Sequence, residues 1–319
     1  MSKSKLAFIT LGLGLSLQLS AQVTAGFIHI PEVIYGNDDR YEVEEYSDKL
    51  FRDHAQSVAG MVKSYKLDDD PENSEMLRFN RIQASRSRGL CKDEKYADQY
   101  TLPICSGFLV DDDILVTAAH CIADVDDCKR KKWVFNYLKG TKKLKRSNVY
   151  GCKEVLLRDQ EETKFKLADY AVIRLDRKVK GREPLKLRKS GYPRIGSDLV
   201  VIGHPSGLPM KISDGASVKW SFNKEEQANV FGTLFKRRYY FKANLDTFSG
   251  NSGSPVFNMK TGKVEGLLVQ GAEDYKWDEE EKCMKVAKKT NKASDAEEMV
   301  FRITKIKGLE KLLSRERNQ

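Results

Sequence analysis

From about residue 82 onward, the sequence predicts an all-β protein. Short segments rich in branched and aromatic residues alternate with turn signals, the pattern of consecutive antiparallel strands. The expected strands are Ile104–Val110, Ile114–Ala118, Trp133–Tyr137, Tyr170–Leu175, Leu199–Gly203, Arg238–Lys242, Pro255–Asn258 and Val264–Val269. The acidic cluster Asp111–Asp113 is typical of a tight turn between the first two. It lacks the alternating ligands of a calcium loop, so no metal site or other cofactor is predicted.

Helices are expected only at the two ends of the chain. Residues 47–63 predict an amphipathic helix capped by Ser47, with one apolar face made of Leu50, Phe51, Ala55, Val58, Ala59 and Val62. Residues 303–317 predict a second helix, with Ile306, Leu309, Leu312 and Leu313 on one side. The polar stretch 68–75 separates the first helix from the strands. Residues 26–81 are therefore an amino-terminal extension, either a propeptide or a clasp on the remaining chain.

The first 25 residues have the composition of a secretory signal peptide. Lys3 and Lys5 precede an apolar stretch from Leu6 to Leu19, and small residues near Ala21 and Ala25 offer cleavage sites. The apolar stretch is too short to span a bilayer comfortably, and no later segment is long and apolar enough. We expect an exported protein without a membrane span, either secreted or periplasmic.

The chain is basic, with a formal net charge of +10 and a pI near 9.1. One cluster of basic residues comprises Lys129, Arg130, Lys131, Lys132, Lys142, Lys143, Lys145 and Arg146. Such a cluster is a possible nucleic-acid surface, but a solvated face of a basic exported protein explains it equally well. No specific nucleic-acid partner is predicted.

Three short motifs occur in the order His, Asp, Ser. His120 lies in Thr117-Ala118-Ala119-His120-Cys121, Asp169 precedes an apolar strand, and Ser252 lies in Gly250-Asn251-Ser252-Gly253-Ser254-Pro255. A serine hydroxyl is a weak nucleophile unless a base removes its proton, and a carboxylate orients that base. Other enzymes that combine Ser, His and Asp in this way place the three residues in different orders along the chain.

These motifs resemble those of the trypsin/chymotrypsin superfamily of serine peptidases. The resemblance covers roughly residues 82–310 and implies two antiparallel β-barrels, one over about 82–185 and the other over about 190–303. A terminal helix over 304–319 would pack on the second barrel. His120 would be the general base, Asp169 its orienting carboxylate and Ser252 the nucleophile. The amides of Gly250 and Ser252 would form the oxyanion hole, and Val269, Gln270 and Gly271 would pair with an extended substrate.

The resemblance also bears on the six cysteines, an even number that fits an oxidising compartment. Cys105 and Cys121 have the spacing of the disulfide that closes the histidine loop in the trypsin family. The other four cysteines allow three pairings. We favour Cys128 with Cys152 and Cys91 with Cys283.

The segment Val33–Arg40 resembles the mature amino terminus of bacterial glutamyl endopeptidases, a branch of the superfamily. Asn251 occupies the position of the aspartate with which trypsin-type zymogens bind a newly freed amino terminus. That switch is not expected here, although removal of an amino-terminal segment could still activate the enzyme.

Asp246 lies six positions before Ser252, where trypsin-like enzymes carry the carboxylate of the primary specificity pocket. It favours cleavage after Lys or Arg. Some glutamyl endopeptidases have a similar string, which leaves a Glu/Asp preference open; their pocket histidine has no counterpart in Leu267–Gly271. His204 is expected to cap a strand near the cleft.

The sequence therefore predicts an exported, monomeric serine endopeptidase that hydrolyses proteins or peptides through an acyl-enzyme. Two alternatives belong to other classes. An inactive homologue would act as a binding module, against which the complete set of motifs speaks. A basic surface binder would show steeply salt-dependent affinity and no acylation of Ser252.

Overall fold

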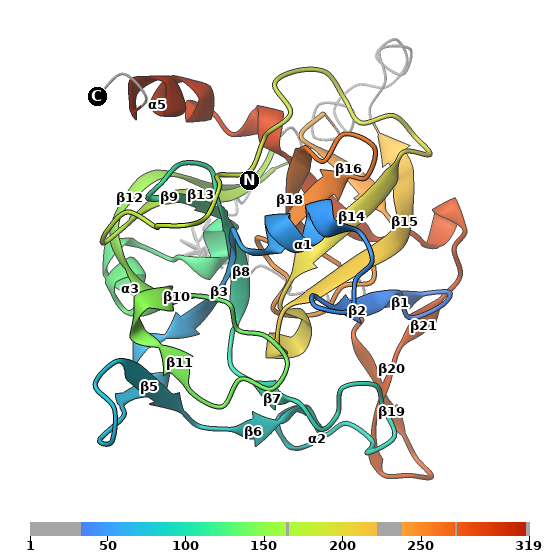
Figure 1. The fold of residues 1–319 in the computed structure, drawn as a ribbon. Coiled ribbons are helices and arrows are strands. Elements are labelled where there is room, and N and C mark those ends of the chain that lie inside the picture. Colours follow the sequence, from blue (N-terminus) through green and yellow to red (C-terminus); the bar gives the residue numbers. More distant parts are fainter. Residues whose placement is uncertain (1–32, 164–165, 222–237, 272, 317–319) are drawn as a thin grey trace, which may run out of the picture.

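The computed structural model describes residues 33–163, 166–221, 238–271 and 273–316. The expected signal peptide and its cleavage positions lie outside the described residues. Two barrels stand side by side, and the first described residues, drawn in blue, run from one barrel to the other (Figure 1). All six cysteines are paired, as Cys91–Cys283, Cys105–Cys121 and Cys128–Cys152, which are the pairings favoured from the sequence.

Barrel one is a closed ring of six antiparallel strands in the order β10-β12-β13-β9-β8-β3. Its strands are β3 (Val58–Lys63), β8 (Cys105–Leu109), β9 (Ile114–Thr117), β10 (Lys131–Phe135), β12 (Val149–Glu162) and β13 (Leu167–Leu175). The interior is filled by buried apolar side chains such as Phe108, Val116 and Trp133. Because β3 belongs to this ring, barrel one begins before the boundary expected near residue 82.

Barrel two closes through the ring β14-β17-β18-β22-β16-β15, whose ends meet because β14 also pairs with β15. Its strands are β14 (Asp198–Gly203), β15 (Lys211–Ser221), β16 (Tyr240–Ala243), β17 (Pro255–Asn258), β18 (Val264–Gln270) and β22 (Glu298–Arg302). The predicted class, all-β with two antiparallel barrels, is confirmed.

Strand β2 (Arg40–Glu42) extends barrel two, because it pairs with the first residues of β15. Smaller pairings surround the barrels. Three two-stranded sheets join β1 (Ile34–Tyr35) to β21 (Lys288–Lys289), β6 (Ile82–Gln83) to β7 (Tyr100–Thr101), and β19 (Tyr275–Asp278) to β20 (Cys283–Val286). A three-stranded sheet places β5 (Met76–Phe79) between β4 (Leu67–Asp69) and β11 (Leu144–Lys145). Residues 33–42 thus form part of the folded structure around barrel two.

The helix expected over residues 47–63 is wrong beyond Ala55. Helix α1 covers Lys49–Ala55, and Val58–Lys63 is strand β3. A short apolar run fits a buried strand as well as a helix, and here pairing with β8 and β10 decides the outcome. The cap is also one residue later than expected, because Asp48 accepts a hydrogen bond from the Leu50 amide. The other α-helices among the described residues are α2 (Ala84–Ser87), α3 (Val125–Lys129) and α5 (Leu309–Glu316).

The terminal helix was expected to pack on barrel two, but helix α5 contacts barrel one. In Figure 1 it lies beyond the ends of β12 and β13. Arg174 of β13 binds Glu316 at the end of the helix with a nitrogen–oxygen distance of 2.9 Å, and the Tyr170 hydroxyl accepts a hydrogen bond from the Lys307 amide. Polar contacts with β13 therefore hold the helix against barrel one. No helix among the described residues is long and apolar enough to cross a membrane.

Candidate active site

His120 and Asp169 form a direct pair in barrel one. His120 lies in the 3-10 turn Ala119–Cys121 that follows β9, and Asp169 lies in β13. The His120 amide donates to Oδ1 of Asp169 at 3.0 Å, and Nδ1 of the ring lies 2.7 Å from Oδ2. Only 3% of Asp169 is exposed. The carboxylate therefore places the proton of a neutral ring on Nδ1 and leaves Nε2 as the basic nitrogen.

An arginine that the sequence did not indicate supports the turn around His120. Arg158 of β12 donates through Nε to the Ile122 carbonyl at 2.7 Å, and through Nη2 to the Ala119 carbonyl at 3.4 Å. These carbonyls belong to the residues on either side of the His120–Cys121 pair. Because Arg158 is 38 positions beyond His120, only the pairing of β12 with β13 brings it there.

Ser252 lies on a tight loop of barrel two between two glycines with positive φ. The φ angle is 108° at Gly250 and 85° at Gly253, a region that favours glycine strongly. A Cβ on Gly253 would collide with the backbone of Ser106 and the side chain of Thr117. The glycine spacing of the motif therefore has two causes, namely the sharp turn and the close contact with barrel one.

The Ser252 loop packs against the segment that leads to His120. The Ser106 amide donates to the Ser252 carbonyl at 2.8 Å, and the Cys121 sulfur lies 3.7 Å from the same oxygen. Since Cys121 is disulfide-bonded, that sulfur is a packing contact and carries no proton. The structure thus brings the loop of Ser252 against the turn of His120, across the interface between the barrels.

The amides of Gly250 and Ser252 are available to bind an oxygen. Among the described residues, neither donates to a protein acceptor, whereas the alternate amides of Asn251 and Gly253 donate to Phe248 and Leu268. An oxyanion hole requires backbone amides that are free to donate to one oxygen. The Asn251 side chain accepts a hydrogen bond from Ser254.

The end of β18 offers a strand edge near this loop. Pairing with β17 ends at Leu267, and the Gly253 and Leu268 amides then cross-link the Ser252 loop to β18. Val269 lies at a β-bulge between the pairs that Leu268 and Gln270 form with β22. Within the described chain, no strand pairs with Val269–Gly271 on the side of β17, so that edge is open to an extended peptide.

Asp246 has a role that the sequence did not predict. It is buried, and its two oxygens accept hydrogen bonds from the amides of Tyr35 at 2.7 Å and Asp39 at 2.9 Å. Burial raises the pKa of Asp246 to about 7 despite these bonds. The residue expected at the base of the specificity pocket therefore also anchors the amino-terminal segment.

Further charged groups surround the chain between Asp246 and Ser252. The Arg40 guanidinium lies 4.3 Å from the ring centre of Phe248 and binds Asp38 at 2.6 Å. Asp274 accepts a hydrogen bond from the Ser249 amide, and burial raises its pKa to about 7. The buried carboxylates of Asp246 and Asp274 thus flank this segment. The buried Arg40 beside it is neutralised by a third carboxylate, that of Asp38.

His204 follows the last residue of β14, as expected for a residue at the end of a strand. Its Nδ1 lies 3.0 Å from the Leu208 carbonyl, and complete burial lowers the pKa of the ring to about 4. The ring is therefore neutral near pH 7. It has no contact with the His120–Asp169 pair among the described interactions.

Within the described parts of the chain, two groups of side chains lie close enough to share a metal ion, around His120 and around Glu281. Each contains two cysteines that are joined in a disulfide, Cys105–Cys121 in one and Cys91–Cys283 in the other. A disulfide sulfur has no thiolate to bind a metal, so neither group is a metal site.

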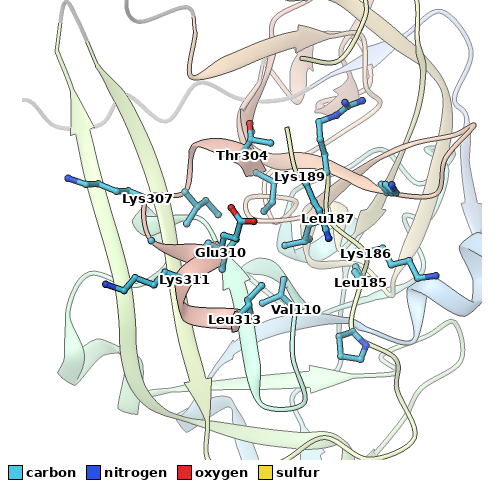
Figure 2. A pocket seen from close by; sticks show the side chains of 17 residues that line it. Val110, Leu185, Lys186, Leu187, Lys189, Thr304, Lys307, Glu310, Lys311 and Leu313 are labelled. Atoms are coloured by element: carbon cyan, nitrogen blue, oxygen red, sulfur yellow. The ribbon is translucent and has the colours of Figure 1, made fainter. Parts of the chain in front are cut away.

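A pocket of about 790 Å³ lies between α5, the residues preceding it and the linker 184–189. In Figure 2 the carboxylate of Glu310 extends over the pocket, whereas Lys307 and Lys311 point away from it. None of the site residues predicted from the sequence lines this pocket.

Comparison with known proteins agrees with this geometry. Residues 105–267 match the family model of the trypsin-like peptidase domain. The chain belongs to this family, and the match includes His120, Asp169 and Ser252. It is therefore a serine peptidase by family and fold. A search of curated proteins found no significant match.

Among solved structures, the inactive form of Rv3671c from M. tuberculosis H37Rv is 13% identical, with a TM-score of 0.46, over 89% of this chain and 97% of that one. The VesB protease of Vibrio cholerae is also 13% identical, with a TM-score of 0.48, over 90% of this chain and 68% of that one. Scores of this size indicate distant similarity only.

Proposed function

We propose that the protein is an exported endopeptidase that cleaves peptide bonds with a Ser252–His120–Asp169 triad. The observation that supports it most strongly is the His120–Asp169 pair, with two hydrogen bonds of 2.7 and 3.0 Å, against which the Ser252 loop packs. Nε2 of His120 takes the proton of the Ser252 hydroxyl as the oxygen attacks the scissile carbonyl. The three disulfides fit a secreted or periplasmic location.

The remaining steps follow from the same residues. The tetrahedral intermediate places its negative oxygen at the amides of Gly250 and Ser252. His120 then donates the proton to the leaving amine, and an acyl ester remains on Ser252. Water, activated by His120, attacks that ester and releases the second product, while the Ser252 oxygen recovers its proton. The substrate backbone adds to the open edge of Val269–Gly271.

We further propose a preference for Lys or Arg before the scissile bond. The support is the negative charge around residues 246–249, where the buried carboxylates of Asp246 and Asp274 accept hydrogen bonds from backbone amides and the nearby Arg40 is bound to Asp38. A cationic side chain would offset these carboxylates, whereas a glutamate would add to them. The family match does not single out the glutamyl-endopeptidase branch, so a Glu/Asp preference is the alternative.

The test is labelling of the purified protein with a fluorophosphonate probe beside Ser252→Ala, with mapping of the adduct by mass spectrometry. We expect one adduct, on Ser252, that is absent from the variant. A binding module without peptidase activity would give no adduct on a folded wild-type chain. Peptides that differ only in Lys, Arg or Glu before the scissile bond then decide between the two preferences.

A further inference from the structure

Ser106 belongs to β8 of barrel one, yet its amide and its hydroxyl both bind the nucleophile loop of barrel two. Its amide donates to the Ser252 carbonyl at 2.8 Å, and its hydroxyl donates to the Gly250 carbonyl, also at 2.8 Å. The side chain is fully buried. A single residue therefore fixes two carbonyls of the loop, away from competing water.

The two carbonyls lie on either side of the peptide group that carries the Ser252 amide. The Gly250 carbonyl belongs to the preceding peptide group, and the Ser252 carbonyl to the following one. When both are held, the peptide group between them has little freedom to rotate. Gly250 lacks a Cβ and sits at a φ of 108°, so its backbone would otherwise have many accessible conformations.

The direction of the Ser106 hydroxyl is fixed by a third group. The His204 amide lies 3.1 Å from the Ser106 oxygen, and an amide can only donate. The hydroxyl therefore accepts from His204 and directs its own proton to the Gly250 carbonyl. A Cβ on Gly250 would lie 2.5 Å from the His204 carbonyl oxygen, so the backbone at His204 also packs directly against Gly250.

We propose that Ser106 is a positioning residue that keeps the Gly250 and Ser252 amides aimed at one oxygen. It acts through these amides and contacts neither substrate nor reacting atoms. The inference rests on the proposed function, in which the two amides form the oxyanion hole. It predicts that loss of the hydroxyl affects the transition state more than it affects substrate binding.

The test compares Ser106→Ala with the wild type on one peptide substrate. Loss of an oxyanion donor costs about 100- to 1000-fold in rate, and loss of its support is expected to cost about 10- to 100-fold in kcat. KM is expected to change by less than about twofold. The affinity for a peptidyl trifluoromethyl ketone, whose adduct carries the oxyanion, is expected to fall in step with kcat/KM.

Thr117→Val is the matched control. The Thr117 hydroxyl is also buried and donates to the Ser106 carbonyl at 2.7 Å, but it binds neither Gly250 nor Ser252. We expect this variant to keep kcat within about threefold, and Ser106→Thr, which retains the hydroxyl, to do the same. If Ser106→Ala does not fold, Ser106→Gly removes the same hydroxyl and takes its place.

The outcomes separate the two proposals. A wild-type chain that is not labelled at Ser252 refutes the proposed function. A labelled wild type whose hydroxyl-free variant keeps its kcat and ketone affinity overturns the positioning role alone. The same holds if kcat falls equally in Thr117→Val, because the effect would then be general to this buried region.

Discussion

The carboxylate of Asp169 binds both the backbone and the ring of His120, so it fixes the position of the base and its tautomer together. Asp169→Asn keeps the shape but presents an amide to Nδ1 and favours the wrong tautomer. We expect kcat to fall by about 10,000-fold, the loss known for this change in the trypsin triad. Single-turnover kinetics and thermal unfolding of the same preparation are the measurements.

A matched control exists on the neighbouring strand. Asp159 lies in β12 and forms an ion pair with Lys166 at 2.8 Å. Asp159→Asn removes one charge from the same sheet without touching His120, and its kcat should stay within about twofold of the wild type. Equal losses in both variants would mean that charge in this sheet, and not the contact with His120, controls the rate.

Asp246 makes stability depend on pH. Burial raises its pKa from 3.8 to about 7 in the folded chain, so the folded state holds an extra proton between these values. The contribution of Asp246 to the free energy of unfolding therefore falls as the pH rises from about 4 to about 7, by no more than about 4 kcal/mol. We expect the stability of the wild type relative to Asp246→Asn to decrease over this range.

Denaturant unfolding of both chains at pH 5 and pH 8 measures the effect. The variant also changes the hydrogen bonds to Tyr35 and Asp39, but that loss is common to both pH values and cancels in the comparison. A stability difference that is the same at the two pH values would show that Asp246 does not titrate in this range.

At the scale of elements, the structure of residues 33–42 depends on partners that lie far away along the chain. Val33, Ile34 and Tyr35 are buried, and Glu42 of β2 binds the buried Lys211 of β15 at 2.9 Å. Without this pair, Lys211 would be an uncompensated buried cation, which costs about 3–5 kcal/mol. Burial already lowers the pKa of Lys211 to about 8.

Two truncations test this element. A chain that begins at Val33 keeps every described contact and should unfold at the temperature of the uncut protein. A chain that begins at Val43 lacks β1 and β2, and should unfold at least about 10 °C lower. Differential scanning calorimetry compares them. Equal unfolding temperatures would mean that residues 33–42 lie on the barrels without stabilising them.

The elements that the sequence predicted are those with a strong local signal. All eight expected strands are present within a few residues, because each is a short apolar run between turns. Strands β12 and β15 were missed, since their charged and half-exposed residues give no such signal. Strand β3 was mistaken for a helix because its partners lie more than 40 positions away along the chain.

The residues of the site also divide into those with a local sequence signal and those without one. The sequence could propose His120 and Ser252 because their motifs are local, and the structure places their loops together. Ser106, Arg158 and the amide partners of Asp246 gave no signal. Their significance lies in single hydrogen bonds between residues 36 to 211 positions apart, and no pattern along the chain encodes those contacts.

For the molecule as a whole, the disulfides differ mainly in the length of chain that they close. Cys91–Cys283 spans 192 residues and Cys128–Cys152 spans 24. In the chain-entropy account, loops of these lengths contribute about 5 and about 3 kcal/mol. We expect Cys91→Ala with Cys283→Ala to lower the free energy of unfolding more than Cys128→Ala with Cys152→Ala. Urea unfolding measures both, and the reverse order would contradict the expectation.

The charge of the whole molecule is less concentrated than the sequence suggested. Several members of the basic cluster bind carboxylates, with Lys131 on Asp127, Lys143 on Asp70 and Arg146 on Asp69. Their field is therefore reduced over this face. Such pairing is typical of a solvated surface and gives no support to a nucleic-acid site.

The placement of β1 and β2 has a consequence for how the chain acquires its structure. These strands are the first in the described chain, but their partners β15 and β21 begin at residues 211 and 288. During synthesis or export from the amino terminus, residues 33–42 must wait until most of the chain has emerged. Contacts between such remote segments form slowly. The last event in folding is therefore expected to join β1 and β2 to the final third of the chain, together with the hydrogen bonds from Tyr35 and Asp39 to Asp246.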